Sequence, residues 1–383
     1  MKIGIDLSLV PGQRAGGGRY SYELARALGR IDPVNSYILY PVFYYIVHPD
    51  YPRVAFPTGR RMRLAFASMP PALIRSLWKL PGAELLKEVL LGNVNVLHSN
   101  TFCVPRFRLG RKRLVVTIYD ASVVTHPQFH VKENIDHCLR GIRAAIERAD
   151  AIITISEHAR RELVERLNVP ADRIAVTPLA PPPELRRVSD PALLGRVRER
   201  YKLPQRFVLF LGMVEPRKNL MRLVEAYAGL SPGARHETEL VVAGPAGWLN
   251  RALFERIEEL GIASSVRFIG YVDDGDLAAV YSLATVFAYP SLYEGFGIPV
   301  LEAMTCGTPV LTSDVAALPE VVSDSALLVP PTDTDAISKA LLRLLESETL
   351  RTDLAARGMS RAALFSWDRC ARETLAVYES VAG

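Results

Sequence analysis

The feature that most constrains the fold of this chain is the stretch Ser291 to Asp314, in which turn-forming residues separate two short apolar segments. Pro290 ends the first apolar segment, Thr285 to Tyr289, because proline cannot donate a hydrogen bond to a neighbouring strand. Pro299 suits the first turn of a helix, and Gly307 suits the position just after its last turn. The pattern therefore predicts a strand, a turn at its carboxyl end, a short helix and a second strand.

The predicted turn carries the groups expected of a site for a nucleotide sugar. Gly295 and Gly297 precede the helix, whose first backbone N–H groups lack helical partners and attract anions. Glu294 and Glu302 flank the turn, and carboxylates accept hydrogen bonds from sugar hydroxyls rather than from phosphate. A phosphate would therefore lie near the N–H groups of Gly297 and Ile298. The alternative is that Glu302 only complements the helix dipole and that Glu294 is a solvated turn residue.

A second group of polar residues, the string E-P-R-K-N, follows the buried apolar strand predicted at Phe207 to Gly212. Within it, Arg217 and Lys218 are adjacent cations at the carboxyl end of a strand in the same sheet, which predicts a clamp on a diphosphate. A solvated charge pair is the alternative. Asn219 is expected to cap the helix that follows.

The spacing of Glu294 and Glu302 resembles the E-x7-E signature of glycosyltransferase family 4, whose retaining enzymes have two Rossmann-like domains facing a cleft, the α/β fold called GT-B. The E-P-R-K-N string resembles the same family's donor-phosphate motif. The resemblance covers nearly the whole chain and is strongest from Phe207 to Asp314. It implies that Glu294 contacts the donor sugar and that Glu302 holds the ribose hydroxyls.

The resemblance also implies the ligands and a set of site residues. The whole chain is similar to bacterial mannosyltransferase-like members that build surface polysaccharides, so the expected donor is GDP-mannose and the expected acceptor is a saccharide or a lipid-linked saccharide. The expected catalytic residues are Arg217, Lys218, Glu294 and Asp120. The expected donor-binding residues are Gly17, Gly18, Arg217, Lys218, Tyr271, Glu294, Gly295, Phe296, Gly297, Ile298 and Glu302.

The first half of the chain opens as a Rossmann-like unit. A predicted strand at Lys2 to Asp6 leads to Gly16, Gly17 and Gly18 and then to an amphipathic helix. Ser21 occupies the position where the dinucleotide fingerprint needs its third glycine, so the pattern is weak evidence for NAD binding. Gly17 and Gly18 are expected to reach the donor diphosphate through their backbone, and a flexible surface turn is the alternative.

Polar residues follow two further predicted strands of this half, where ligands bind in parallel sheets. His98 ends the first of these strands, and Tyr119 and Asp120 follow the second. All three are candidates for contact with the acceptor. The family often has histidine at the position of Tyr119, so the side chain that meets the donor sugar stays open. Asp120 either orients the acceptor hydroxyl or caps the following turn.

The length of 383 residues exceeds that of one ordinary core and predicts more than one domain. A proline-rich stretch begins at Ala180, and we expect an acceptor-side domain at 1–184, a linker at 185–205, a donor domain at 206–364 and a C-terminal helix at 365–383 that crosses back to the first domain. The four cysteines show no C-x-x-C spacing, which favours a reducing cytoplasm over a zinc site or a disulfide framework. No segment resembles a signal peptide or a membrane span.

Two further patterns leave alternatives open. Asp273, Asp274 and Asp276 contain a D-x-D string, which in other glycosyltransferases holds a divalent metal. Here they precede a helical pattern and are expected to cap it, so no metal or other cofactor is expected. The basic, apolar-faced stretch Pro52 to Leu91 suits either peripheral contact with an anionic membrane or a helix with a solvated face. The net charge of +5 favours an anionic partner, which we expect to be the nucleotide sugar and not a nucleic acid.

Two other functions remain compatible with the sequence. A sugar-nucleotide epimerase or hydrolase of the same fold would form product without an acceptor. A non-catalytic sensor would bind the nucleotide sugar and turn nothing over.

Overall fold

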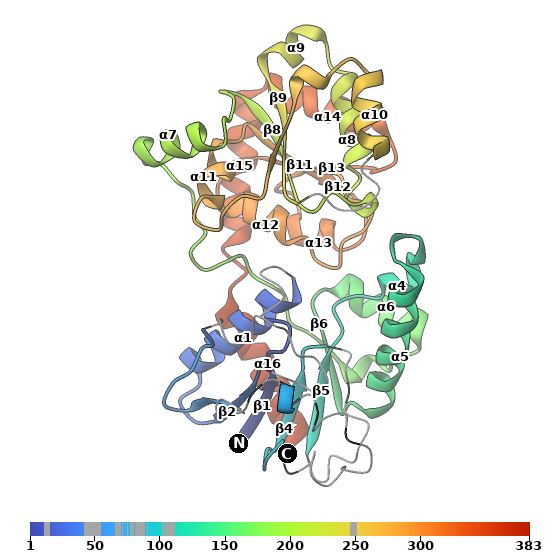
Figure 1. The fold of residues 1–383 in the computed structure, drawn as a ribbon, viewed down its shortest axis with the longest axis vertical. Coiled ribbons are helices and arrows are strands. Elements are labelled where there is room, and N and C mark those ends of the chain that lie inside the picture. Colours follow the sequence, from blue (N-terminus) through green and yellow to red (C-terminus); the bar gives the residue numbers. More distant parts are fainter. Residues whose placement is uncertain are drawn as a thin grey trace. The chain divides into compact units, whose positions relative to one another are not determined.

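The computed structural model describes residues 1–10, 16–41, 55–65, 70, 72–74, 76, 80, 89, 91–101, 104, 112–245 and 251–383. These residues form two compact units (Figure 1). Unit 1 comprises Met1–Leu179 and Trp367–Gly383, and unit 2 comprises Ala180–Ser366. Each unit contains a parallel sheet interleaved with helices, so the predicted α/β class is confirmed.

Unit 1 is built on a seven-stranded parallel sheet in the order β3-β2-β1-β4-β5-β6-β7. Its strands are buried almost throughout, as expected for a parallel sheet covered on both faces. The strands are β1 (Lys2–Asp6), β2 (Ser36–Tyr40), β3 (Met62–Leu64), β4 (Val96–Ser99), β5 (Arg113–Thr117), β6 (Ala151–Thr154) and β7 (Ile174–Val176). The described helices include α1 (Gly17–Ile31), α4 (Ser122–Thr125), η2 (Pro127–Phe129), α5 (Lys132–Arg148), α6 (Glu157–Leu167), η3 (Ala171–Arg173) and α16 (Trp367–Ala382).

Unit 2 is built on a six-stranded parallel sheet in the order β10-β9-β8-β11-β12-β13. The strands are β8 (Phe207–Leu211), β9 (Glu239–Ala243), β10 (Val266–Gly270), β11 (Val286–Tyr289), β12 (Val310–Ser313) and β13 (Leu327–Val329). The helices include α7 (Pro191–Arg200), η4 (Pro216–Lys218), α8 (Leu220–Ala228), α9 (Pro232–Glu237), α10 (Arg251–Glu259), η5 (Ala263–Ser265), α11 (Leu277–Leu283), α12 (Ile298–Thr305), α13 (Leu318–Val322), α14 (Thr334–Glu346) and α15 (Glu348–Ala362).

The strand order of unit 2 determines where a ligand can bind. β8 pairs with β9 on one side and with β11 on the other, so the chain changes direction across the sheet between β8 and β11. In open parallel sheets the loops that leave the carboxyl ends of two such strands diverge and form a ligand crevice. The loop containing η4 follows β8, and the turn predicted from the sequence follows β11, so both lie at this point.

The boundaries of the two units differ from those predicted. The segment expected to be a linker, 185–205, contains the helix α7, which packs against α11 within unit 2. Arg200 of α7 forms salt bridges with Asp273 and Asp276, of which the one to Asp276 measures 2.7 Å. Trp367–Gly383 belongs to unit 1, where α16 packs against α1.

Two helix caps were predicted, at Asn219 and at the aspartates before α11, and neither side chain caps its helix, whereas Ser156 does form a cap. Ser156 caps α6, because its side chain accepts a hydrogen bond of 3.0 Å from the Ala159 N–H. The prediction for Asn219 was wrong: its backbone is left-handed, with a φ of 62°, and its side-chain amide donates to the carbonyls of Pro290 and Pro331. Asp276 makes no side-chain cap on α11. The side chains of Asn219 and Asp276 bind residues elsewhere in unit 2 instead of the ends of their helices.

No helix in the part of the chain that the structure describes is both long enough and apolar enough to cross a membrane. Within the basic stretch Pro52 to Leu91 the structure describes 55–65, where Met62–Leu64 form the strand β3 and not the predicted helix, and only scattered residues beyond.

We expect Gly244→Ala to destabilise the protein by about 1–3 kcal/mol. Gly244 has a φ of +127°, and a Cβ atom there would lie 2.1 Å from the carbonyl oxygen of Gly212, which is backbone and cannot swing away. Thermal unfolding measures the effect. Gly275→Ala is the matched control, because a Cβ at Gly275 meets nothing within 4 Å. Equal melting temperatures for the two variants would contradict the clash.

Candidate functional site

The loop after β8 and the turn after β11 are joined directly. The Leu292 N–H donates a hydrogen bond of 2.8 Å to the carbonyl of Arg217, and the Ser291 hydroxyl donates to the same oxygen at 3.0 Å. Residues about 75 positions apart in sequence therefore form one surface at the carboxyl ends of two adjacent strands. The two polar groups found in the sequence belong to a single site.

Glu294 is the centre of a buried cluster of charges. Its Oε1 lies 2.6 Å from the Lys218 ammonium, and its Oε2 lies 3.2 Å from the Arg217 guanidinium. Arg217 also donates to the carbonyl of Tyr293 at 2.9 Å and to Glu215 at 2.7 Å. The Glu294 side chain is only 8% exposed, so these pairs are poorly screened by water. The solvated alternatives for this glutamate and for the cation pair are therefore wrong.

The cations determine the charge state of Glu294. Burial alone would raise the pKa of its carboxyl, but the charges of Lys218 and Arg217 lower that pKa to about 2. A hydrogen bond from Ser291 acts in the same direction. Glu294 is therefore ionised at neutral pH, and both of its carboxylate oxygens can only accept hydrogen bonds.

The stability difference between wild type and Glu294→Gln is expected to depend on pH. Folding depresses the pKa of Glu294 from 4.5 to about 2, so its ion pairs stabilise the protein fully above about pH 4.5 and lose that effect as the pH falls toward 2. The melting temperatures of the two proteins should converge on acidification. Parallel melts from neutral pH to about pH 3 measure this, with the exposed Glu258→Gln as control. A gap that stays constant down to pH 3 would contradict the ion pairs.

The turn between Glu294 and α12 has a glycine with a positive φ at the start of the helix. Gly297 has a φ of +103°, and a Cβ there would lie 2.6 Å from the Leu318 side chain. Beside it, Gly295 is buried, and Phe296 packs edge-on against Phe365 at 5.8 Å. The prolyl first turn of α12 begins at Ile298, as predicted. The first N–H groups of the helix therefore lie next to the charge cluster in sequence and carry the partial positive charge of a helix N-terminus.

Glu302 lies on α12, one helical turn beyond the turn residues. It is buried, and its Oε2 accepts a hydrogen bond of 3.0 Å from the hydroxyl of Tyr281 on α11. Sequence reasoning did not find Tyr281, because nothing in the pattern of α11 separates this tyrosine from an ordinary core residue. The structure therefore places Glu302 in a polar contact inside unit 2 rather than free on a helix surface.

Three further residues of the site were missed. Glu215 holds the second nitrogen of the Arg217 guanidinium, and its place in the E-P-R-K-N string was the available signal. Ser291 links the two loops and bonds Glu294 at 2.9 Å. Tyr289, at the end of β11, lies with its ring centroid 5.2 Å from the Lys218 ammonium, which is a favourable cation–π distance.

Tyr271 and the aspartates after it lie at the surface of unit 2. Tyr271 is 52% exposed, and its hydroxyl donates to Asp274 at 3.2 Å. Among the described residues, no group of three or more histidines, cysteines, aspartates or glutamates is arranged to hold a metal ion.

The remaining predicted residues belong to unit 1. Gly17 and Gly18 form the first turn of α1 and not a loop, and a Cβ on Gly17 would lie 3.1 Å from the hydroxyl of Tyr119. That hydroxyl donates to the carbonyl of Asn100 at 3.0 Å. Asp120 accepts a hydrogen bond of 2.9 Å from the Ser122 N–H, which is the turn-capping contact considered from the sequence.

His98 does not have the environment predicted for an acceptor contact. It is completely buried, with one ring nitrogen 2.5 Å from the Tyr378 hydroxyl of α16 and the other 2.8 Å from Thr117. Burial lowers the pKa of the imidazole to about 3, so it is neutral. Because both nitrogens are used inside unit 1, His98 is a core residue that secures α16.

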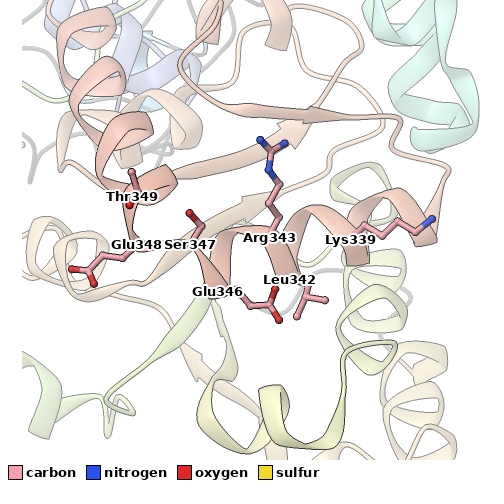
Figure 2. Close-up of a pocket in the computed structure, with 7 residues that line it drawn as sticks. All are labelled: Lys339, Leu342, Arg343, Glu346, Ser347, Glu348 and Thr349. Atoms are coloured by element: carbon pink, nitrogen blue, oxygen red, sulfur yellow. The ribbon is translucent and has the colours of Figure 1, made fainter.

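A hollow on unit 2 lies away from this site. Figure 2 shows its lining on the last turns of α14 and the first turn of α15, including Lys339, Arg343 and Glu348. Arg206, which immediately precedes β8, donates to the Leu345 carbonyl at the end of α14. This hollow therefore lies at the amino ends of the strands, opposite the edge that carries Glu294.

Two family models match the chain in succession. The model described as Glycosyltransferase Family 4 matches residues 14–183, and the model described as Glycosyl transferases group 1 matches residues 196–361. The O-antigen chain mannosyltransferase B of Escherichia coli is 35% identical over 368 residues, which cover 94% of this chain and 95% of that protein.

Solved structures match the fold of the whole chain. Anabaena Alr3699/HepE, solved in complex with UDP and glucose, aligns with a TM-score of 0.74 and 17% identity over 99% of both chains. Sucrose-phosphate synthase from Thermosynechococcus elongatus aligns with a TM-score of 0.72 and 23% identity over 99% of this chain and 98% of the other. The two units therefore have the fold of GT-B glycosyltransferases. The chain belongs to glycosyltransferase family 4, as the motifs in its sequence predict.

Proposed function

We propose that this glycosyltransferase moves mannose from GDP-mannose to a saccharide or lipid-linked saccharide, with retention of anomeric configuration, in the synthesis of a cell-surface polysaccharide such as an O-antigen. The observation that carries the proposal is the buried Glu294 carboxylate held between Lys218 and Arg217. The similarity to an O-antigen mannosyltransferase along 94% of the chain supports mannose as the transferred sugar.

In this proposal the cations of the site bind the diphosphate of the donor, and the carboxylates bind its sugars. Lys218 and Arg217 neutralise the charge that builds on the departing diphosphate, aided by the N–H groups near Gly297 and Ile298. Glu294 accepts hydrogen bonds from the transferred sugar, and Glu302 accepts them from the ribose.

The cations can serve Glu294 and a diphosphate together. An ammonium has three N–H donors and a guanidinium has five, and in this proposal each side chain donates to the diphosphate as well as to Glu294. The bond to Glu215 also fixes the plane of the Arg217 fork before any ligand arrives. A preorganised fork costs little reorganisation during the reaction.

The remaining contacts are assigned to the other predicted residues. Gly17 and Gly18 would present the first turn of α1 to the diphosphate, where N–H groups lack helical acceptors. Tyr271 would lie near the base. Tyr119 and Asp120 would contact the acceptor or the donor sugar, and the Ser122 contact of Asp120 leaves its second carboxylate oxygen for this purpose.

A thermal-shift panel of GDP-, UDP-, dTDP- and ADP-sugars, followed by a turnover assay, tests the proposal. A ligand at 100 times its Kd stabilises the protein by about 2.7 kcal/mol. We expect GDP-mannose to give the largest shift and GDP release to require an acceptor. Product formed without an acceptor would indicate an epimerase or a hydrolase, and donor binding without turnover would indicate a sensor.

We also expect transfer to proceed without a divalent cation. The charge stabilisation that a metal would supply is assigned to Arg217, Lys218 and the start of α12. Activity should be unchanged in EDTA and after adding Mg²⁺ or Mn²⁺. Loss of activity in EDTA that either metal restores would contradict this assignment and point to Asp274 and Asp276.

The place of the reaction in the cell belongs to the same proposal. A cytoplasmic enzyme at the inner face of the cytoplasmic membrane would meet a lipid-linked acceptor, and the basic stretch Pro52 to Leu91 would supply a peripheral contact. Co-sedimentation with anionic vesicles, lost at high salt and on neutralising Arg60, Arg61 and Arg63, would support the contact. No binding at low salt would rule it out.

A further inference from the structure

A hollow in unit 1 lies at the same sheet edge as Asp120. It has a volume of about 610 Å³, which is within the range of small-molecule sites. One side of it is formed by the end of α4 and His126, and the other side by α6. α4 follows the carboxyl end of β5, and α6 follows the carboxyl end of β6, so both helices begin at the edge where parallel sheets bind ligands. Figure 1 shows α4 and α6 at the same end of the unit.

The lining contains a buried carboxylate and an oriented imidazole. Glu162 is only 8% exposed, and its Oε1 lies 3.3 Å from Nε2 of His158. Across from them, the His126 ring stacks on Phe129 at 5.8 Å, and its Nδ1 lies 2.9 Å from the Thr125 hydroxyl. These contacts hold the ring in place before a ligand binds, which reduces the entropy lost on binding.

The titratable groups that act on the His126 imidazole lie on α6 and just before α4. Glu162 and His158 lie on α6, and Asp120 lies just before α4. Burial lowers the pKa of His126 and outweighs the opposing effect of Glu162. The imidazole is therefore neutral near pH 7, with one nitrogen that donates and one that accepts.

The charges and hydrogen-bonding groups that line the hollow determine which class of ligand fits it. Two arginines, Arg161 and Arg166, are matched by two glutamates, Glu162 and Glu165, so the hollow has no excess charge to select an anion. Seven of its eight lining residues carry polar or charged side chains, and Val124 is the exception. Hydroxyl groups that both donate and accept suit this mixture of carboxylates, guanidinium groups and imidazoles.

We propose that this hollow binds the saccharide part of the acceptor, holding sugar residues next to the one that reacts near Asp120. The inference rests on the proposed function and adds to it the place and the chemistry of acceptor recognition. In this inference His126 and Glu162 select a neutral glycan over a ligand that carries a phosphate group.

The experiment measures binding of a short manno-oligosaccharide to the full-length protein by NMR titration, alongside calorimetry of GDP. We expect His126→Ala and Glu162→Gln each to raise the oligosaccharide Kd by about tenfold or more while the GDP Kd stays the same. In a transfer assay the same variants should raise the acceptor KM and leave kcat within a few-fold. Inorganic phosphate should not compete with the oligosaccharide.

The matched control is Glu157→Gln, which alters an exposed glutamate on α6 that does not line the hollow. It should bind the oligosaccharide as wild type does. If Glu162→Gln fails to fold, His126→Ala and Arg161→Ala still test the hollow, because neither removes a buried carboxylate. Wild-type affinity in His126→Ala, an equal loss in Glu157→Gln, or no oligosaccharide binding by wild type would each overturn the inference.

The outcomes also separate this inference from the proposed function. A wild type that transfers sugar while the variants keep their acceptor affinity would refute the hollow alone. A wild type that transfers nothing from any donor, yet binds the oligosaccharide through His126, would refute the proposed function and leave the hollow as a saccharide site.

Discussion

Lys218→Ala is expected to lower kcat by about 10²–10³-fold, which is typical of removing one preorganised group that stabilises charge in a transition state. The ammonium is held by Glu294 at 2.6 Å and by the ring of Tyr289, so it is already placed before the donor binds. Because the charge on the leaving diphosphate grows only as the bond breaks, the loss should appear mainly in kcat.

Arg217→Ala should lower kcat by a similar factor and weaken donor binding as well. Arg217→Lys should recover little, because a point charge cannot replace a planar fork that bonds Glu215, Glu294 and the Tyr293 carbonyl at once. Steady-state kinetics with the proposed donor, GDP-mannose, and a saccharide acceptor provide the measurement.

Lys339→Ala, which removes an exposed lysine of unit 2, controls for a general loss of charge. Circular dichroism and melting curves control for folding, because removing one partner of a buried ion pair costs about 3–5 kcal/mol. If Lys218→Ala and Arg217→Ala are folded and keep kcat within a few-fold of wild type, the cluster has only a structural role.

Glu302→Ala is expected to weaken binding of the nucleoside diphosphate by about 1.5–3 kcal/mol, the range for hydrogen bonds to a charged group. This corresponds to a change in Kd of roughly 10- to 150-fold. Calorimetry of GDP with wild type and variant measures the change. A 2′-deoxy nucleotide should lose affinity for wild type, and Glu302→Ala should distinguish it far less from GDP.

Tyr281→Phe separates ribose binding from a structural effect. Tyr281 donates to Glu302 inside unit 2, so removing the carboxylate also leaves a buried hydroxyl without its partner. If Tyr281→Phe weakens GDP binding as much as Glu302→Ala does, the carboxylate acts through packing. If Glu302→Ala leaves the Kd unchanged, Glu302 does not hold the ribose.

The elements around the site followed from local rules of the sequence. Pro290 and Gly307 bracket a turn and a short helix because the backbone preferences of proline and glycine act over one or two residues. The alternation of apolar strands and amphipathic helices implied parallel sheets for the same reason, since burial on both faces requires continuous apolar runs. The resemblance of the E-x7-E and E-P-R-K-N strings to the family supplied the class of enzyme.

Tertiary contacts decided how individual polar side chains are used. Asn219 and Asp276 have the residue types of helix caps, yet distant carbonyls and Arg200 bind them instead. His98 is likewise bound by a residue that is distant in sequence, because Tyr378 of the C-terminal helix α16 packs against it. A local pattern contains no information about such partners.

The sequence by itself therefore determined the two parallel sheets, the turn after β11 and the residue types at the site, because these depend on backbone preferences and on periodic burial. Only the tertiary structure decided that Glu294 lies between Lys218 and Arg217, that Tyr281 bonds Glu302 and that segment 185–205 contains a helix of unit 2. The physical reason is that strand order brings β8 beside β11, although more than seventy residues separate them in sequence. The strength of a charge pair depends on the distance between the two charges in space and on their burial, which a local pattern does not contain.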